Sequence, residues 1–367
     1  MFLSVSQDVL SEHLQTVCKA VPLKTTITAL EGILLESDGK KVTLTANNLE
    51  MGIRSSFSVS QTKVGKVLLP AKIVEIIKRL PDKSVEFSVN ADNYLTNIKS
   101  GQSEFQLYGT NPEEFPSFPV SVEDKLLSFS INCADLRRIL RQTLFAISHD
   151  EGKTAFTGIQ FSVYDDVLTL ASSDTFRLAN TKCKVINKEG ENADFLVPAK
   201  IMQEVVRIFS DDESFIKVDF LKNQLLLESG DTKLVSRLLD EKFPNVDRVI
   251  PKEYSTQAIV DVNSLQRAVE RASLLAEGVN HIIRMSINSS EIVIKAASKY
   301  GKVQEQIPVK LDGDELEIAL NARFLLDMLK ICEGENCAMQ FTGSYKPIVL
   351  KDFTYKEYLY LVLPVKS

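Results

Sequence analysis

The residue types that most often perform catalysis or bind metals are sparse in this sequence. Its three histidines, His13, His149 and His281, lie far apart along the chain. They also fall at different places within the internal repeat that the sequence contains. A metal site or a catalytic triad needs such groups to converge. The histidines therefore predict neither kind of site.

Two short patterns imitate catalytic motifs without meeting their requirements. Gly152-Lys153-Thr154 resembles the end of a phosphate-binding loop, but that loop needs a glycine where Ile147 stands. The segment 37–40 matches the SxxK pattern of some serine hydrolases, but it lies in a predicted hairpin turn. We interpret both patterns as structural. No paired carboxylates can be identified from one sequence, so an enzyme with a weakly marked site stays an open alternative.

Composition favours a globular protein of the cytoplasm with more than one core. The chain has 367 residues, of which 44% are hydrophobic and 25% are charged. It contains no apolar run of membrane-spanning length and no signal peptide is predicted at its N-terminus. Its five cysteines lack CxxC spacing, which favours free thiols in a reducing compartment. The net charge is −6, so an anionic partner would have to meet a local basic region.

One strand-to-helix segment recurs three times along the chain. It spans 67–77, 195–205 and 318–328, which gives a period of about 125 residues. Each copy has a short apolar run followed by apolar residues at helical spacing. Pro70 and Pro198 are expected at the first helical position, where a missing N–H costs nothing.

Two further elements recur with nearly the same period. Asp-Gly at 38–39 predicts a hairpin in 32–46, and matching hairpins are predicted in 158–170 and 283–294. Each unit also opens with an amphipathic helix. The apolar faces of these three helices carry Leu10, Leu14, Leu136, Leu140, Leu265 and Val269.

The repeat predicts three α+β domains, at 1–122, 128–248 and 252–367. Residues 121–125 and 251–253 are expected to link them. Each domain should contain two helices packed on antiparallel strands. A repeated unit of this kind can close into a ring or stack as an array.

Positive charge gathers on the six predicted helices. These helices are predicted at 6–22, 70–80, 132–148, 198–209, 261–278 and 321–332. These segments contain 13 basic and 9 acidic residues, although the whole chain is acidic. If the helices share one side, that side is mildly basic. Because phosphate contacts carry no sequence information, a mildly basic surface suits sliding on DNA. Ordinary solvated helix faces are the alternative interpretation.

Several short stretches resemble the bacterial DNA polymerase III beta subunit family, the beta sliding clamps. The Leu-Pro-Ala-Lys and Val-Pro-Ala-Lys junctions carry the resemblance together with 43–51, 173–179, 242–244, 248–251 and 361–364. Each stretch is weak alone, but their order and spacing over three repeats are specific. The resemblance covers essentially the whole chain.

This resemblance implies a fold of three DNA-clamp domains and a head-to-tail homodimer that forms a closed ring. Double-stranded DNA would pass through the ring, with helices lining the hole and sheets outside. The implied partners are a clamp loader, the replicative DNA polymerase and repair proteins that dock through short peptides. It implies no catalytic residue, no cofactor and no metal.

The resemblance also implies four DNA-facing positions. They are Lys24 after the first helix, Lys72 at the start of the second, and Asp150 and Lys153 in one loop. That loop departs from the family pattern because Asp150 and its neighbour Glu151 are acidic. The two earlier lysines are therefore the stronger expectations.

A peptide-docking site is implied between the second and third domains. Its residues would be Ser173, Thr175, Phe176, Arg177, Leu178, Pro244, Arg248, Val249, Tyr345, Pro347, Leu361, Leu363, Pro364, Val365 and Lys366. The apolar members suit a floor, and the three basic members suit a peptide's polar groups. Thr175 and Phe176 depart from the small-plus-histidine pair of some members. Alternatively, Leu361 and Leu363 are simply one face of the last strand.

Ring closure is implied at two further places. Phe105 and Leu107 lie on a late strand of the first domain, and Leu274 and Leu275 end the first helix of the third. By resemblance these ends meet across the dimer. The alternative is that all four leucine and phenylalanine side chains serve their own domain cores.

Two other function classes stay open on sequence grounds. One is an enzyme built on a triplicated fold, which would show turnover unrelated to DNA topology. The other is a scaffold or inhibitor that has the clamp fold and binds partners without encircling DNA. Retention on circular DNA distinguishes the ring from both.

Overall fold

The computed structural model describes residues 1–81, 83–118, 125–276, 278 and 281–365. These residues form two compact units. The first unit contains 1–133, 186–191 and 207–238, and the second contains 134–185, 192–206 and 239–367. The middle repeat thus contributes strands to both units. The predicted linker at 121–125 lies almost entirely outside the described residues.

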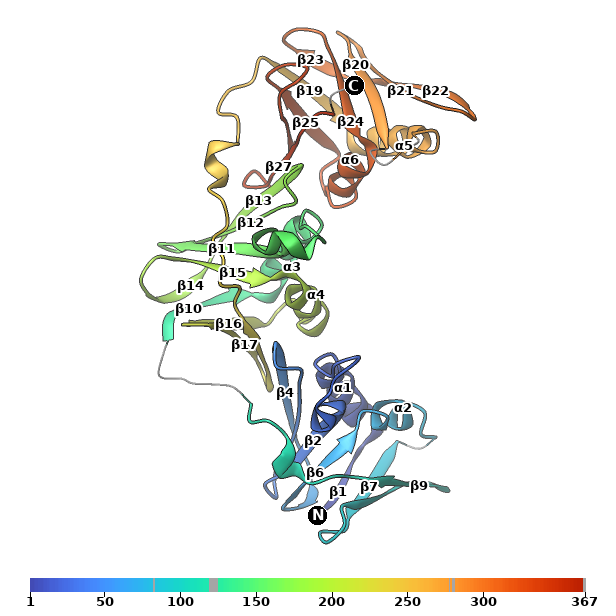
Figure 1. Cartoon of the computed structure of the whole chain (residues 1–367), viewed down its shortest axis with the longest axis vertical. Coiled ribbons are helices and arrows are strands. Elements are labelled where there is room, and N and C mark those ends of the chain that lie inside the picture. Colours follow the sequence, from blue (N-terminus) through green and yellow to red (C-terminus); the bar gives the residue numbers. More distant parts are fainter. Residues whose placement is uncertain (82, 119–124, 277, 279–280, 366–367) are drawn as a thin grey trace. The chain divides into compact units, whose positions relative to one another are not determined.

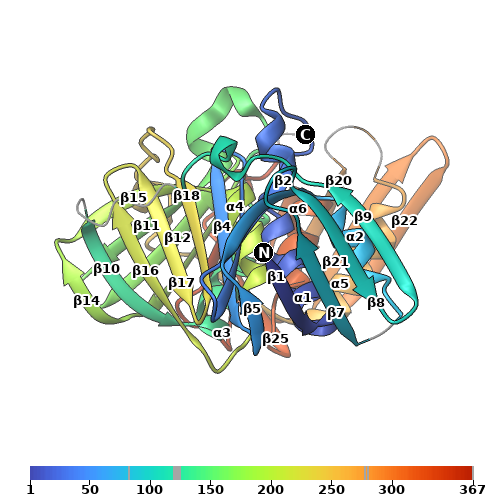
Figure 2. The same cartoon turned by 90° about the horizontal axis from the view of Figure 1, so that it is seen from below.

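The first unit contains two antiparallel sheets. The five-stranded sheet has the order β5 Gln61–Lys63, β1 Phe2–Ser6, β7 Ser84–Val89, β8 Leu95–Ser100 and β9 Ser103–Tyr108. Its strand β9 is an edge strand, visible as the outermost strand of this sheet in Figure 2.

The second sheet of this unit has nine strands. Their order is β14 Ile186–Gly190, β10 Lys125–Asn132, β16 Phe215–Leu221, β17 Gln224–Ser229, β18 Thr232–Arg237, β4 Met51–Ser58, β3 Lys41–Asn47, β2 Gly32–Ser37 and β6 Gly65–Pro70. The junction between β18 and β4 joins the middle repeat to the first, with Thr232 opposite Ser55 and Ser236 opposite Met51.

Two helices complete the first repeat. Helix α1 spans Gln7–Cys18 and helix α2 spans Ile73–Lys78; α1 packs on β3 and β4 and against α2. Figure 1 shows the two helices together beside this sheet. The predicted face of α1 is buried, because Leu10 and Leu14 are at most 2% exposed. Short 3₁₀ turns lie at Thr28–Glu31 and Pro112–Glu114.

The second unit also has a nine-stranded and a smaller sheet. The larger one has the order β15 Ala193–Pro198, β11 Gly158–Tyr164, β12 Val167–Ser173, β13 Arg177–Lys184, β27 Leu359–Val362, β26 Ile348–Asp352, β25 Asn336–Phe341, β19 Thr256–Asp261 and β23 Lys310–Asp312. The smaller one has the order β22 Gly301–Pro308, β21 Glu291–Ser298, β20 Ile282–Ile287 and β24 Leu316–Asn321.

Four helices belong to the second and third repeats. They are α3 Cys133–Leu144, α4 Ala199–Ile208, α5 Val262–Ser273 and α6 Ala322–Leu329, with 3₁₀ turns at Glu151–Thr157 and Val246–Arg248. Helix α5 begins at a cap in which Asp261 Oδ1 accepts the N–H of Ser264 at 2.7 Å. Such a cap satisfies one of the N–H groups that a helix start leaves unpaired.

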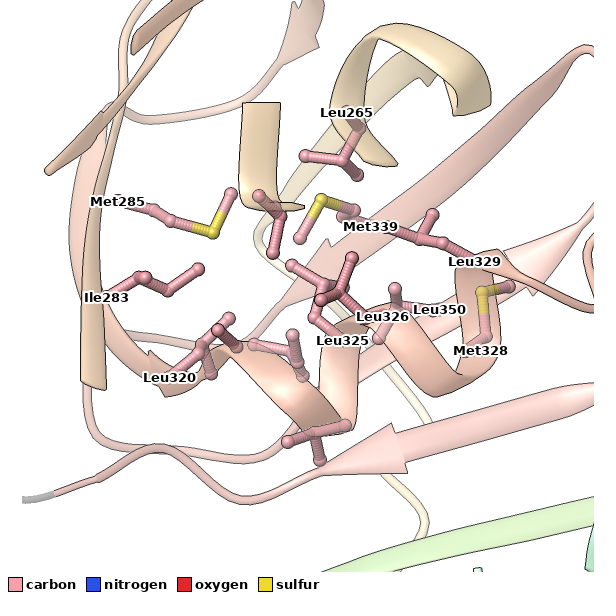
Figure 3. Packing of buried hydrophobic residues seen from close by; sticks show 14 of the residues in the cluster. Leu265, Ile283, Met285, Leu320, Leu325, Leu326, Met328, Leu329, Met339 and Leu350 are labelled. Atoms are coloured by element: carbon pink, nitrogen blue, oxygen red, sulfur yellow. The ribbon is translucent and has the colours of Figure 1, made fainter. Parts of the chain in front are cut away.

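The core of the third repeat lies between α5, α6 and the strands of both sheets. Figure 3 shows Leu265 from α5 facing Leu325 and Leu329 from α6, with Met285 from β20 beside them. Each of these side chains is at most 1% exposed. Burying one such side chain contributes about 1.5–3 kcal/mol. This core fixes α6, which contributes to the site described next.

The three predicted hairpins are present, as are all six predicted helices. Strands β2–β3, β11–β12 and β20–β21 are antiparallel pairs, and Gly39 in the first turn has a φ of +94°. The expectation for the two prolines was wrong. Pro70 and Pro198 are the last residues of β6 and β15, and both pair with strand neighbours. Each proline lies on an edge strand of its sheet, where the missing N–H group is tolerated.

Candidate functional site

The turn between β12 and β13 is held in shape by its own side chains. Ser173 Oγ accepts the N–H of Thr175 at 3.1 Å and donates to the carbonyl oxygen of Arg177 at 2.7 Å. Asp174 Oδ1 accepts the N–H groups of Phe176 and Arg177 at 2.9 and 3.0 Å. These bonds give the turn a defined geometry, and the turn carries four of the predicted docking residues.

Thr175 adopts a backbone conformation that is rare for its type. Its φ is +81°, and a β-branched side chain in this region is a genuine outlier. Such a conformation costs roughly 1–3 kcal/mol and persists where the surroundings fix it. Here the bonds from Ser173 and Asp174 supply that constraint. The turn then presents the ring of Phe176, which is 55% exposed.

The ring of Phe176 joins elements of two repeats. It stacks on Phe324 of α6, with ring centroids 6.5 Å apart and planes inclined by 26°. On the same ring, Lys153 Nζ lies 5.9 Å from the centroid, within the range of a cation–π interaction. The result is a partly exposed aromatic surface next to a positive charge.

Arg177 lies beneath this surface and is almost fully buried. Its Nε donates to Asp174 Oδ2 at 2.9 Å and its Nη1 donates to Asp327 Oδ2 at 2.5 Å. Its Nη2 donates to the carbonyl oxygen of Phe145 at 2.6 Å. Burial alone would lower the pKa of Arg177, but Tyr360 and the Asp327 carboxylate raise it above its ordinary value.

The N–H donors of Arg177 therefore bind groups within the protein. From the sequence, Arg177 was instead predicted to bind the polar groups of a docked peptide. The physical reason is that a buried guanidinium needs carboxylate partners of its own. The guanidinium carbon also lies 4.5 Å from the ring centroid of Phe324. Arg177 thus positions Phe324, and through it the exposed Phe176.

An apolar floor lies where β13 meets β27. Leu178 and Leu361 are directly opposite each other, and both are 3% exposed. They form a buried cluster with Val349 of β26, against which Val246 and Ile250 pack. The structure therefore brings two predicted docking residues together as a floor that is already partly covered.

Two backbone hydrogen bonds attach the C-terminal tail, residues 363–365, to the turn between β12 and β13 and to β24. The N–H of Leu363 donates to the carbonyl oxygen of Phe176 at 2.9 Å, and the N–H of Val365 donates to that of Ala319 at 2.8 Å. Leu363 is 37% exposed, and Pro364 and Val365 are half-buried. Of the described side chains of this tail, that of Leu363 is the most exposed and is therefore the one available to a ligand.

The remaining predicted docking residues are at the surface. Val249 is 54% exposed and Tyr345 is 76% exposed; Pro244 and Arg248 are exposed as well. Pro347 is half-buried. Lys366 lies outside the described residues. A set of exposed apolar and aromatic side chains around a buried floor is a normal mark of a binding site.

The two lysines expected to face DNA are exposed. Lys24 follows α1, and Lys72 is the residue that precedes α2. Neither forms an ion pair with another described residue. Asp150 instead accepts the N–H of Gly152 at 3.0 Å and so caps its own 3₁₀ turn. Lys153 lies over Phe176, which places it beside the docking residues.

With the observed helix bounds, the excess of positive charge on the helices is smaller than expected. The six helices contain nine basic and seven acidic residues. The predicted helices were longer at both ends and included Lys19, Lys72 and Lys330. The basic excess therefore depends largely on residues at and beyond the helix ends.

The two predicted contact points for a second copy lie next to edge strands. Phe105 on β9 is 40% exposed and Leu107 is half-buried. Leu274 caps the C-terminus of α5 and is 80% exposed, and Leu275 is half-buried. Strand β22, which ends the four-stranded sheet beside α5, was not among the predicted sites.

The described residues were also compared with the requirements of a metal site, a reactive thiol and a membrane-spanning helix. They contain no cluster of three or more His, Cys, Asp or Glu side chains suited to a metal ion. Burial raises the pKa of Cys183 and of Cys337 to about 12, so both thiols stay protonated at neutral pH. No helix in the described part of the chain is long and apolar enough to cross a membrane.

Comparison with protein families accounts for the three repeats. Residues 1–119, 130–245 and 247–366 match the N-terminal, central and C-terminal domains of the DNA polymerase III beta subunit. The chain belongs to the DNA polymerase III beta subunit family. The beta sliding clamp of Halalkalibacterium halodurans is 33% identical, and that of Staphylococcus aureus is 30% identical. Both alignments cover 100% of each chain.

Solved structures of the family have the same fold. The DNA polymerase sliding clamp of Bacillus subtilis superposes with a TM-score of 0.94 at 31% identity, covering 100% of this chain and 99% of the other. A DNA polymerase III beta subunit from Eubacterium rectale superposes with a TM-score of 0.93 at 26% identity, and both chains are covered completely. The fold prediction of three α+β clamp domains is confirmed.

Family membership also decides the general role. The chain is a sliding clamp, a non-catalytic accessory subunit that makes a DNA polymerase processive. The histidines and the two motif-like segments, 37–40 and 152–154, are thus interpreted as parts of the fold rather than of an active site. Asp327, Phe324 and Phe145, which contact the predicted docking residues Phe176 and Arg177, were not found by sequence reasoning. Asp327 is 150 positions from Arg177, and no local pattern links the two.

Proposed function

We propose that two copies of this chain close head-to-tail into a ring through which duplex DNA passes without sequence preference. The observation that carries this proposal is the pair of edge strands, β9 and β22, each beside exposed apolar residues. An edge strand has unpaired backbone groups that can add a strand from another chain. The two surfaces differ, so their contact is heterologous, and two such contacts complete a closed ring.

In this ring, Lys24 and Lys72 contact phosphates of the enclosed DNA. Their ammonium groups are exposed and have no carboxylate partner among the described residues. Because a closed ring keeps its DNA by topology, a few weak contacts are enough. More numerous contacts would slow sliding, since each phosphate neutralised adds to the affinity.

We further propose that partners dock at the surface around Phe176, Leu361 and Leu363. The replicative polymerase, repair proteins and the clamp loader would each insert a short peptide there. The floor formed by Leu178 and Leu361 accepts apolar side chains, and the rim offers polar groups. The cytoplasm is the proposed location, because all five cysteines are free thiols in the structure.

The test uses DNA topology with the full-length protein. The chain is loaded onto nicked circular DNA by a bacterial clamp loader with ATP and is separated from free protein by gel filtration. We expect it to stay with the circle and to be released when a restriction enzyme linearises the DNA. Release should be blocked when the linear ends carry bound protein.

Two results would contradict the ring. Equal retention on circular and linear DNA would indicate ordinary binding rather than encirclement. A monomer in sedimentation at micromolar concentration would leave no second copy to close the ring. Binding of partner peptides without any retention on circles would instead favour the scaffold alternative.

A further inference from the structure

A cavity of about 790 Å³ opens on one face of the large sheet of the second unit. Its floor is formed by β11, β12 and β13, and its far side by residues 356–359. Residues 243–247 and Ile250 line the cavity as well. They belong to the coil with one helical turn that is drawn in gold in Figure 1. None of the DNA-facing or dimer residues lines this cavity, which we call the outer groove.

The floor of the outer groove carries polar side chains in two cross-strand rows, with Val167 and Ala171 among them. Thr169 lies between Ser162 and Lys182 in one row, according to the strand register. Asn180, opposite Leu359, belongs to the next row. These side chains are half-buried except for Lys182, which is exposed. Hydroxyl and amide groups at this spacing can both donate to and accept from an extended backbone.

The charges around the outer groove have both signs. Its lysines are Lys182, Lys351 and Lys356, and its carboxylates are Asp194, Asp247 and Glu357. None of these lysines forms an ion pair with a described residue. The three carboxylates offset the three lysines, so the lining has no net positive charge to attract a nucleic acid. A polypeptide segment, which carries both charges and a polar backbone, matches this lining better.

The outer groove shares a wall with the docking surface. Val246 and Ile250 line the groove and also pack on the floor residues Leu178 and Leu361. Val249, a predicted docking residue, lies between them in the chain and is exposed. The segment 246–250 therefore borders both the outer groove and the proposed docking surface.

We propose that the outer groove binds the extended, mixed-charge polypeptide segment that flanks the docking motif of a partner protein. The inference rests on the proposed docking function, because the motif brings the flanking segment to the groove. Lys182 and Lys351 pair with acidic side chains of the segment. Gln160, Thr169 and Asn180 bind its backbone. The motif supplies recognition, and the flank adds affinity that differs between partners.

The experiment compares two synthetic peptides by isothermal titration of the full-length protein. One is the short clamp-binding motif of a bacterial replicative polymerase, and the other is the same motif with ten native residues added on each side. We expect the extended peptide to bind roughly tenfold more tightly, equivalent to about 1.4 kcal/mol. The double variant Lys182→Glu, Lys351→Glu should bind both peptides with the affinity of the short one.

The matched control is Lys295→Glu with Lys310→Glu, two exposed strand lysines outside the outer groove. This control should keep the full advantage of the extended peptide. If charge reversal impairs folding, Lys182→Gln with Lys351→Gln removes the same two charges and should give a partial loss.

The possible failures are distinguishable. If the short peptide binds and the extended peptide is no tighter, the outer groove has no such role, although docking stands. Equal losses for both peptides in the lysine variants would also overturn the inference. If neither peptide binds the wild-type protein, the docking proposal itself fails.

Discussion

The proposed docking surface and the proposed DNA-facing positions are built in opposite ways. At the docking surface, Phe176 is held by a bonded turn and a stacked ring, above a guanidinium bound on three sides. Lys24 and Lys72 instead extend into solvent, with no ion pair to a described residue. The side chains of the first region are held in a fixed geometry by their neighbours. The two lysine side chains of the second region have almost no such support.

This difference matches two kinds of recognition. A short peptide must be distinguished from many others, so its site needs preorganised shape and buried support. DNA inside a ring must slide, so its contacts need charge without fixed geometry. If this comparison is right, changes at the docking surface should have large structural costs. Changes at the lysines should have small, salt-dependent ones.

The largest expected effect is that of Arg177→Ala. The change removes a buried guanidinium and leaves the half-buried carboxylates of Asp174 and Asp327 without it, which should lower the free energy of unfolding by about 3 kcal/mol. The measurement is urea unfolding followed by circular dichroism, because the chain contains no tryptophan. Arg248→Ala is the exposed control and should change stability by less than about 0.5 kcal/mol. Similar small effects for both variants would show that the buried network contributes little.

Ring closure should be nearly as sensitive to charge. Leu274→Lys with Leu275→Lys places two ammonium groups in the proposed contact, which should cost several kcal/mol and leave a folded monomer. Leu23→Lys alters a fully exposed leucine elsewhere and should leave the dimer intact. Sedimentation at micromolar protein measures both. A persistent dimer in the double variant would place the contact elsewhere.

Removing the C-terminal tail tests the docking surface directly. Deletion of 363–367 removes Leu363 and the bond from Val365 to Ala319, but it leaves β27 and its pairing with β13. The truncated protein should stay a folded dimer and lose clamp-binding peptide affinity by about 100-fold or more. Calorimetric titration gives the affinity. An unchanged value would remove the tail from the site.

A smaller effect of opposite sign is expected for Thr175→Gly. Glycine adopts positive φ without strain, so the variant should gain up to about 1 kcal/mol of stability after its own entropy cost. Thr43→Gly in strand β3 has no such strain to relieve and should destabilise by about 1 kcal/mol. Thermal unfolding compares the two variants. Destabilisation of both would show that the turn does not strain Thr175.

The smallest effect is expected at the DNA-facing lysines. Lys24→Ala and Lys72→Ala should each weaken DNA contact modestly and reduce the slope of affinity against salt by about one. Lys310→Ala, on an edge strand of the second unit, should leave that slope unchanged. Folding and dimerisation should survive in all three variants. A lysine variant that unfolds would have a structural role instead.

Periodicity predicted the fold well because it reports local geometry. The helix faces with Leu10 and Leu14, the Asp-Gly hairpin and the strand-to-helix junctions all depend on neighbours in sequence. The prolines were misplaced because a residue that ends an edge strand and one that begins a helix satisfy similar backbone constraints. Pro198 is only one residue from the start of α4.

The structural support of the proposed docking site could be predicted from the sequence only in part, and its residues only through family resemblance. Its turn and tail residues were named, but their support comes from α6 and the end of α3. Asp327 and Phe324 look like ordinary helix residues in the sequence. They lie beside Arg177 and Phe176 in a fold where β13 pairs with β27, a contact between strands far apart in the chain. A single sequence carries no signal for such a pairing.

Strand pairing between repeats also determines which contacts should break first when the ring is pulled open. Strand β18 pairs with β4 over five residues, and β13 pairs with β27 over four, so successive repeats are joined by backbone bonds as well as by the chain. Pulling neighbouring repeats apart would shear these bonds together, whereas two copies have no covalent connection. Mechanical opening should therefore occur between copies and spare the joints within each chain. Amide protons in β4 and β13 should accordingly exchange slowly even while the ring opens and recloses.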